Sequence, residues 1–379
     1  MFLNEDLLNK IHENAPKYDA ENTFPYEDFS LLKEAGYYKA LVPKEYGGFG
    51  LSLKELAQEQ TRLAKNAPGT ALGINMHHVI VGMAKHMVKN GNMRGEQILR
   101  DAVNGELLAF GISEPANDRV LFGSIAKATA TEDGGYLFNG KKVFISMVNQ
   151  CTKLITYAQE ETENGPLSIF AYLDKNPETI IADDNWNALG MRATQSNNVL
   201  LRDAYASESQ ILTKVKPGPT FDAVVFGIFG YFEILLAATY HGIGDRAVEL
   251  GIEGTKKRKS ISNNTTYNND KDIRWRIADA AIRQDAVKDQ INLLADQFET
   301  GYDHGSLWMP KLSAVKNNAV EASKHTVDQI VRALGGSSYY NTHELSRLLR
   351  DVYAGLFQPS DQESLHNAWA SVLMGPIRD

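Results

Sequence analysis

The residue most suited to chemistry is Glu233, the only formal charge inside the most apolar stretch of the chain, Ala223–Tyr240. An unpaired buried charge is very costly, so this side chain must pair with a cation, take up a proton or line a cavity. A carboxyl group in apolar surroundings has a raised pKa and can act as a general base near neutral pH. Glu233 is therefore either a structural carboxylate with a buried partner or a catalytic base.

The apolar stretch around Glu233 is 18 residues long and just reaches the length of a membrane-spanning helix. A carboxylate near the centre of a bilayer would cost several kcal/mol, and no basic flank orients the segment. We therefore expect a buried helix inside a soluble helical bundle.

Length and charge narrow the classes of protein. A chain of 379 residues exceeds one ordinary core, so two or three packed units are expected. A net charge of -8 without a long basic cluster argues against nucleic acid or an anionic membrane as the main partner, although a local positive pocket for phosphates remains possible. No basic segment followed by an apolar one opens the sequence, so we expect no signal peptide and a cytoplasmic location.

Few residues suit metal or thiol chemistry. Cys151 is the only cysteine, which excludes a disulfide framework and a cysteine-based zinc site. His77 and His78 are adjacent on a predicted helix, where neighbouring side chains point to different sides and chelate poorly. We expect one of them to pack and the other to reach solvent, and we predict no metal site.

The hydrophobic periodicity divides the chain into three parts. It is helical over residues 1–108, alternating over 109–215 and helical again over 216–379. Within the first part, Ser52 and Glu55 form a capping box that opens a helix. Within the second, Asn139-Gly140 indicates a hairpin turn between strands at 136–138 and 143–145. We interpret the polar stretch Ile261–Asp270 as an exposed loop.

Seven short motifs follow one another in a recognisable order along about 300 residues. They lie at Val42–Gly48, Phe110–Pro115, Gly140–Ser146, Leu189–Arg192, Arg258–Ser260, Leu334–Gly336 and Arg350–Asp351. In this order they resemble the acyl-CoA dehydrogenase superfamily of flavoproteins. The resemblance implies a multidomain α+β fold with an N-terminal helical domain, a middle antiparallel β-barrel and a C-terminal four-helix bundle.

The resemblance also implies a bound flavin, FAD in the first instance, and a set of residues that contact it. Short hydroxyls and an aromatic face suit the ring, while fixed cations and close backbone approach suit the diphosphate. The diphosphate site is shared between subunits in this family, so a dimer or tetramer is expected. The implied flavin contacts are Phe110, Ile112, Ser113, Phe144, Ser146, Arg258, Ser260, Arg332, Gly335 and Gly336.

The sequence departs from the family pattern at the catalytic base. Many members carry a glutamate about eight residues beyond the Arg-Asp pair, a position that falls on Pro359 here. The nearby Glu363 is accounted for by capping, with Ser360 as the N-cap of the last helix. A minority of members place the base on the first bundle helix, within one residue of Glu233. Glu233 is therefore the best candidate for the base.

Three functions remain open. The first is an acyl-CoA dehydrogenase of fatty acid metabolism, in which hydride passes from an acyl thioester to flavin N5 and on to an electron-transfer flavoprotein. The second is a monooxygenase of the same fold that uses FMN or FAD, a separate reductase and O2; residues 190–194 and the two histidines would suit it. The third is a catalytically silent flavin-binding protein. A changed continuation at Ala116–Val120 puts the usual acyl-CoA pocket in doubt.

Overall fold

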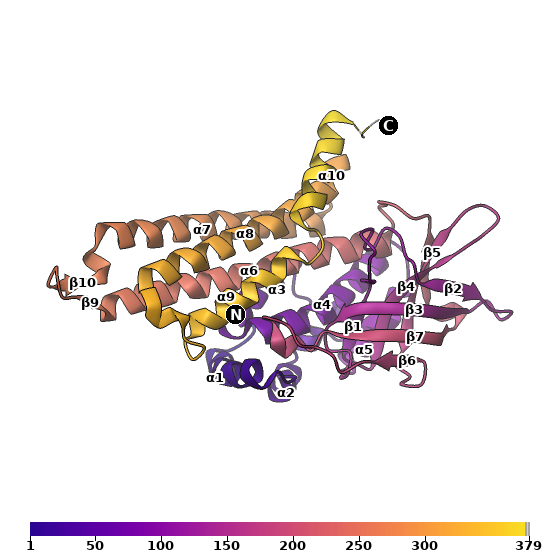
Figure 1. Cartoon of the computed structure of the whole chain (residues 1–379). Helices are drawn as coiled ribbons and strands as arrows, with labels where there is room; N and C mark the ends of the chain where they lie inside the picture. Colours follow the sequence, from indigo (N-terminus) through magenta and orange to yellow (C-terminus); the bar gives the residue numbers. More distant parts are fainter. Residues whose placement is uncertain (376, 378–379) are drawn as a thin grey trace.

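The computed structural model describes residues 1–375 and residue 377. It confirms the fold class predicted from the sequence: helices, then a sheet, then a long helical bundle (Figure 1). The N-terminal helices are α1 (Glu5–Glu21), α2 (Tyr26–Glu34), α3 (Leu53–Asn66), α4 (Pro68–Lys89) and α5 (Gly95–Val103). Ser52 and Glu55 form the predicted capping box at the start of α3. Helix α4 is buried on almost every side, which makes it the centre of this part of the chain.

The middle of the chain folds into one open sheet. Its strands are β1 (Leu108–Gly111), β2 (Lys127–Ala130), β3 (Tyr136–Ile145), β4 (Lys153–Glu160), β5 (Leu167–Asp174), β6 (Ile180–Ala182), β7 (Asn197–Ala206) and β8 (Ile211–Val215). They lie in the order β6-β7-β3-β2-β4-β5-β8, and β1 pairs with β4 in parallel. The predicted antiparallel barrel is therefore a mixed sheet that does not close. Alternation of apolar residues indicates a strand but not the direction of its neighbour.

The hairpin predicted at Asn139-Gly140 is wrong, because β3 runs through these two residues without turning. The strand shifts its register against β7 at this point, and a Cβ on Gly140 would lie 2.5 Å from the Cβ of Ala126. The glycine thus allows a bulge and a close approach between backbones. The real turn between β2 and β3 lies at 131–135, where the amide of Thr131 donates to the carbonyl of Gly135.

The C-terminal part is built on α6 (Ala223–Lys257), with α7 (Lys271–Thr300) and α8 (Trp308–Leu334) beside it and two shorter helices, α9 (Glu344–Val352) and α10 (Gln362–Met374). Helices α3 and α4 cover the remaining sides of α6. This helix is long and apolar enough to cross a membrane, but 83% of its most apolar window is buried inside the protein, as expected for a core helix. The stretch predicted as an exposed loop, Ile261–Asp270, contains β10 (Thr265–Thr266), which pairs with β9 (Lys259–Ser260) just before it.

Two of the recognised motifs meet each other and hold the sheet against the helices. The amide of Met191 donates to Asp351 Oδ1 at 2.6 Å, and Arg350 donates to both carboxylate oxygens of Asp19 on α1. A Cβ on Gly190 would lie 2.2 Å from the carbonyl oxygen of Arg350, so only glycine fits this contact. The motifs at 189–192 and 350–351 therefore join the three parts of the chain.

Candidate functional site

The structure brings the first group of predicted flavin contacts together at the end of β1 and along β3. The amide of Val143 donates to the carbonyl of Ser113 at 2.9 Å, which places the two segments side by side. Phe144 has a positive φ of 59° and is 68% exposed, so its ring is open to a ligand. Ser146 shares a hydrogen bond with Ser196, with 2.8 Å between their hydroxyl oxygens.

The other two members of this group differ in exposure. The ring of Phe110 lies 6.0 Å from that of Phe232 on α6, while the side chain of Ile112 is buried in the core. Phe144 is exposed and Ser113 is half-buried, whereas Ser146 is buried. An aromatic ring beside a short hydroxyl is a surface that fits an isoalloxazine.

A buried ion pair that sequence reasoning missed fixes these two segments. Lys142 Nζ lies 2.5 Å from Glu114 Oε1, and both side chains are fully buried. Burial acts to raise the pKa of Glu114, but Lys142 and the donors Ser124 and Ile125 outweigh it and hold the pKa below its usual value. Glu114 and Lys142 each lie in one of the motifs that carry the family resemblance. Membership of these motifs was the only feature of the sequence that could have identified the two residues. The pair holds the Ser113 segment against the strand that carries Phe144.

The second group of predicted contacts lies at the far end of α6, beside the β9–β10 hairpin (Figure 1). Arg258 donates to the carbonyl of Leu334, and its guanidinium lies 4.5 Å from the centre of the Tyr267 ring. Gly335 has a positive φ of 69°, and a Cβ there would lie 2.9 Å from Arg258 Nη1. Space around Gly336 is open. A cation beside open glycine backbone can hold a diphosphate.

The remaining members of the second group are placed less favourably. Ser260 lies in β9, and its hydroxyl accepts a hydrogen bond from the amide of Asn263. Arg332 is turned to solvent and forms an ion pair with Asp328 one turn earlier on α8. Among the described residues, no hydrogen bond links Arg332 to Arg258 or Gly335.

The two groups are far apart within one chain. Phe232, which meets Phe110, precedes Arg258 by 26 residues of continuous helix. At 1.5 Å per residue this separation is about 40 Å along α6. One flavin cannot contact both groups of the same chain.

Glu233 is completely buried under the loop that connects α9 to α10. Its Oε1 accepts hydrogen bonds from the amide and the hydroxyl of Ser360 at 3.0 and 2.8 Å, while Oε2 has no hydrogen-bond partner among the described residues. Burial raises the pKa of Glu233 to about 7, although Lys316 and Ser360 act to lower it. The buried Lys316 Nζ instead donates to the carbonyls of Gly355, Gln358 and Ser360 at 2.6 to 2.8 Å.

This arrangement corrects the predicted role of Ser360. The N-cap of α10 is Asp361, which accepts from the amide of Ser364 at 2.8 Å. The cap therefore lies one residue later than predicted, and the hydroxyl of Ser360 donates to Glu233 instead. The side chain of Glu233 faces this loop, whereas the preceding Phe232 faces Phe110 on β1. Consecutive residues of a helix point about 100° apart, so the ring of Phe232, and not the carboxylate of Glu233, faces Phe110.

The prediction that one of the two adjacent histidines reaches solvent is wrong, because both are fully buried in α4. His77 Nε2 lies 2.8 Å from the carbonyl of Tyr38, and its Nδ1 accepts from the amide of Leu108, so the ring joins α4 to the start of β1. His78 lies edge-on to the ring of Tyr37, and burial holds its pKa well below the usual value. Neither ring is open to a ligand. No cluster of metal-ligating side chains occurs within residues 1–375 and 377.

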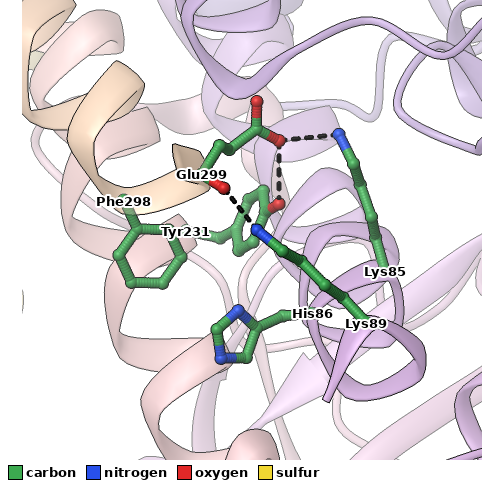
Figure 2. A pocket seen from close by; sticks show the side chains of 6 residues that line it. All are labelled: Lys85, His86, Lys89, Tyr231, Phe298 and Glu299. Atoms are coloured by element: carbon green, nitrogen blue, oxygen red, sulfur yellow. Dashed lines mark hydrogen bonds and ion pairs between the residues drawn. The ribbon is translucent and has the colours of Figure 1, made fainter. Parts of the chain in front are cut away.

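A recess of about 180 Å³ lies between α4, α6 and α7 (Figure 2). Glu299 accepts hydrogen bonds there from Lys85 at 2.6 Å and from Tyr231 at 3.2 Å, and from the amide of Leu53 at 2.8 Å. Lys89 donates to the backbone carbonyl of Glu299. These charges satisfy one another, and none of the predicted flavin contacts lines the recess. It is a structural junction of α4, α6 and α7 with the start of α3.

Comparison with known proteins adds independent findings. The model of the acyl-CoA dehydrogenase N-terminal domain matches residues 5–106, and that of the C-terminal domain matches residues 234–357. The amino sugar nitrososynthase DnmZ of Streptomyces peucetius is 24% identical over 367 residues, covering 93% of this chain and 87% of that protein. The putative acyl-CoA dehydrogenase YdbM of Bacillus subtilis is 24% identical over 358 residues, covering 93% and 91%.

Among solved structures, KijD3 in complex with FMN and dTDP-3-amino-2,3,6-trideoxy-4-keto-3-methyl-D-glucose superposes with a TM-score of 0.86 at 23% identity, covering 99% of this chain and 92% of that chain. This likeness concerns the fold. The match extends over the helices and the sheet alike, so the arrangement of all three parts is shared.

Proposed function

We propose that this chain, which belongs to the acyl-CoA dehydrogenase superfamily, is a flavin-dependent monooxygenase of this fold. The members that it resembles are flavin oxidoreductases. In this reaction reduced flavin supplies two electrons to O2. One oxygen atom enters a small-molecule substrate and the other leaves as water. A separate flavin reductase would supply the reduced cofactor.

The observation that carries this proposal is that neither of the two candidate positions for the base directs a carboxylate at the predicted flavin surface. Dehydrogenation of an acyl thioester needs a base that removes the α-proton. The position about eight residues beyond the Arg-Asp pair holds Pro359, and Glu233 turns into the Ser360 loop while Phe232 occupies the face toward Phe110. Transfer of an oxygen atom from O2 with electrons from reduced flavin requires no base that removes an α-proton. The similarity to a nitrososynthase and to a structure that contains FMN supports the same choice.

The chain's own residues would bind and orient the cofactor. Phe144 and Ser146 would cover the ring and its polar edge, with the Ser113 segment held beside them by the Glu114–Lys142 pair. Arg258 and the backbone of Gly335 would hold the phosphate end. Since these groups lie about 40 Å apart along α6, we propose that the ring is bound by one copy of the chain and the phosphate end by another. FAD suits this arrangement, and FMN remains the alternative.

Acyl-CoA dehydrogenation is the second candidate, and one observation favours it. The pKa of Glu233 is raised to about 7, and its Oε2 lacks a hydrogen-bond partner in the described part of the chain. A carboxyl group in this state has the properties of a general base. To act as one it would have to leave Ser360 and turn toward Phe110 on β1. An electron-transfer flavoprotein would then be the expected partner.

The proposal is tested with the full-length protein, chemically reduced FMN or FAD and ¹⁸O2. Candidate amines, indoles and acyl-CoA thioesters are supplied in turn, and products are examined by mass spectrometry. We expect one labelled oxygen atom in a product, formed only when protein and reduced flavin are both present. A protein that binds neither flavin, or that oxidises acyl-CoA to the enoyl thioester without incorporating label, would contradict the proposal.

A further inference from the structure

Strand β3 carries Phe144 at an irregular point of its backbone. The φ of Phe144 is 59°, a conformation that is rare and strained for a bulky side chain. The pairing of β3 with β7 also shifts its register between Lys142 and Ile145. Bulges of this kind change the direction of a side chain and are frequent next to active sites. The strain at Phe144 therefore indicates that the direction of its ring matters for function.

A second aromatic ring packs against Phe144. The centre of the Trp186 ring lies 6.4 Å from that of the Phe144 ring, and the two planes meet at 84°. This edge-to-face arrangement is a favourable one for aromatic rings. Trp186 is half-buried and lies in the loop between β6 and the 3-10 turn η3 (Arg192–Thr194). It belongs to none of the motifs that carry the family resemblance, so it was not among the predicted flavin contacts.

Hydrogen bonds fix both the backbone and the indole of Trp186. Its amide donates to Asn197 Oδ1 at 2.9 Å, and its indole Nε1 donates to the carbonyl of Arg192 at 3.1 Å. Its own carbonyl accepts from Asn22 Nδ2 at 2.6 Å. Asn197 is the first residue of β7 and Asn22 ends α1, so Trp186 is attached to the sheet and to the N-terminal helices. Phe144, which is 68% exposed, thus packs against a ring that cannot turn freely.

The two rings form a corner that suits a flat aromatic ligand. A planar ring system that stacks on one of them is nearly perpendicular to the other, and it meets that second ring edge-to-face. Both contacts are favourable. The loop carries two exposed aspartates, Asp183 and Asp184, just before Trp186, and their charges disfavour a phosphate group nearby. The corner therefore suits the ring of a flavin and not its phosphate end.

We propose that Trp186 is a further residue of the flavin site, which positions Phe144 and contacts the isoalloxazine. This inference rests on the flavin binding proposed above and adds one residue to the first group of contacts. Trp186 then contributes to the affinity for the flavin ring itself. Arg258, in the second group, contributes only to the affinity for the phosphate end.

The test compares the binding of FAD with that of lumiflavin, the flavin ring system without its ribityl phosphate chain, by fluorescence titration of the full-length protein. Trp186→Leu should weaken the binding of both ligands by about fivefold, since both lose the same aromatic contact. Arg258→Gln should weaken FAD and leave lumiflavin unchanged. The control is Trp275→Leu, at an exposed tryptophan on α7, which should keep the wild-type affinity for lumiflavin.

Trp186→Phe separates the aromatic contact from the structural role of Trp186. Both Trp186→Leu and Trp186→Phe lose the hydrogen bond from the indole to the carbonyl of Arg192, but only Trp186→Leu loses the aromatic ring. We therefore expect Trp186→Phe to bind lumiflavin within about twofold of the wild type. Lumiflavin is achiral, so its visible circular dichroism at saturation arises from the groups around it, and we expect this signal to change in both variants.

The outcomes distinguish this inference from the proposed function. A wild-type protein that binds neither FAD nor lumiflavin would overturn both. If the wild type binds them, an unchanged affinity for lumiflavin in Trp186→Leu would overturn the inference about Trp186 alone. Equal losses of affinity in Trp186→Leu and Trp186→Phe would also overturn it, because they would come from the lost hydrogen bond. If Trp186→Leu does not fold, a wild-type circular dichroism of lumiflavin bound to Trp186→Phe would be the contradicting result.

Discussion

Two buried combinations of glutamate and lysine occupy different regions of the molecule and are built in opposite ways. In the sheet, Lys142 and Glu114 contact each other directly, and further donors surround the carboxylate. In the bundle, Lys316 donates to three backbone carbonyls, and Glu233 keeps one oxygen without a partner among the described residues. The first arrangement holds the segment after β1 against β3. The second leaves a carboxyl group whose charge state can change without breaking an ion pair.

The largest expected effect comes from breaking the pair in the sheet. Lys142→Met leaves the carboxylate of Glu114 buried without its cation, which should cost about 3–5 kcal/mol of unfolding free energy. Lys141→Met, at the exposed neighbouring lysine, is the matched control and should change stability by about 0.5 kcal/mol or less. Urea unfolding of both variants measures the difference. Equal stability of the two variants would show that the pair contributes nothing.

The next effect concerns the pH dependence of stability. The pKa of Glu233 is raised from its ordinary 4.5 to about 7, so the stabilisation from its protonated form is complete below pH 4.5 and is lost as the pH rises through 7. Glu233→Gln removes this loss. Between pH 4.5 and pH 7 the free energy of unfolding of the wild type should therefore fall, relative to that of the variant, by on the order of 3 kcal/mol.

Urea unfolding at a series of pH values measures this gain. The exposed Glu363→Gln on α10 is the control and should keep the wild-type dependence. Parallel curves for the wild type and Glu233→Gln would contradict the raised pKa.

A smaller effect is expected at Lys316. Lys316→Met removes the donor to three carbonyls, while Glu233 becomes neutral instead of being left as an unpaired charge. The loss of unfolding free energy should be about 2 kcal/mol, less than for Lys142→Met. Urea unfolding at pH 6 gives the comparison. A loss equal to or larger than that of Lys142→Met would mean that Lys316 and Glu233 behave as a true ion pair.

The smallest effect concerns cofactor affinity at the distal end of α6. Arg258→Gln should weaken flavin binding about tenfold by removing a charge-assisted contact to the phosphate end. Arg332→Gln should leave it unchanged, because Arg332 faces solvent and pairs with Asp328. Fluorescence titration with FAD and FMN measures both. Equal losses in the two variants would place Arg332 in the site as the family resemblance implied.

The sequence was sufficient for the order of the three parts, for α6 as a buried helix and for the capping box at Ser52, because these depend on local patterns. Features that depend on contacts distant in sequence were not predictable. Alternation could not show that β1 runs parallel to β4, and Asn139-Gly140 forms a bulge because β3 continues past Ala126. Asp361, and not Ser360, caps α10, so the hydroxyl of Ser360 is available to donate to Glu233. Serine and aspartate are both good N-cap residues, so the sequence alone did not distinguish them.

The central claim is that Glu233 does not serve as the base of a dehydrogenase. It is tested most directly by anaerobic titration of the flavin-loaded wild-type protein and of Glu233→Gln with acyl-CoA thioesters of several chain lengths, following the visible absorption of the flavin. The account predicts that the flavin stays oxidised in both proteins. Bleaching of the wild-type flavin that is lost in Glu233→Gln while the flavin remains bound would contradict it.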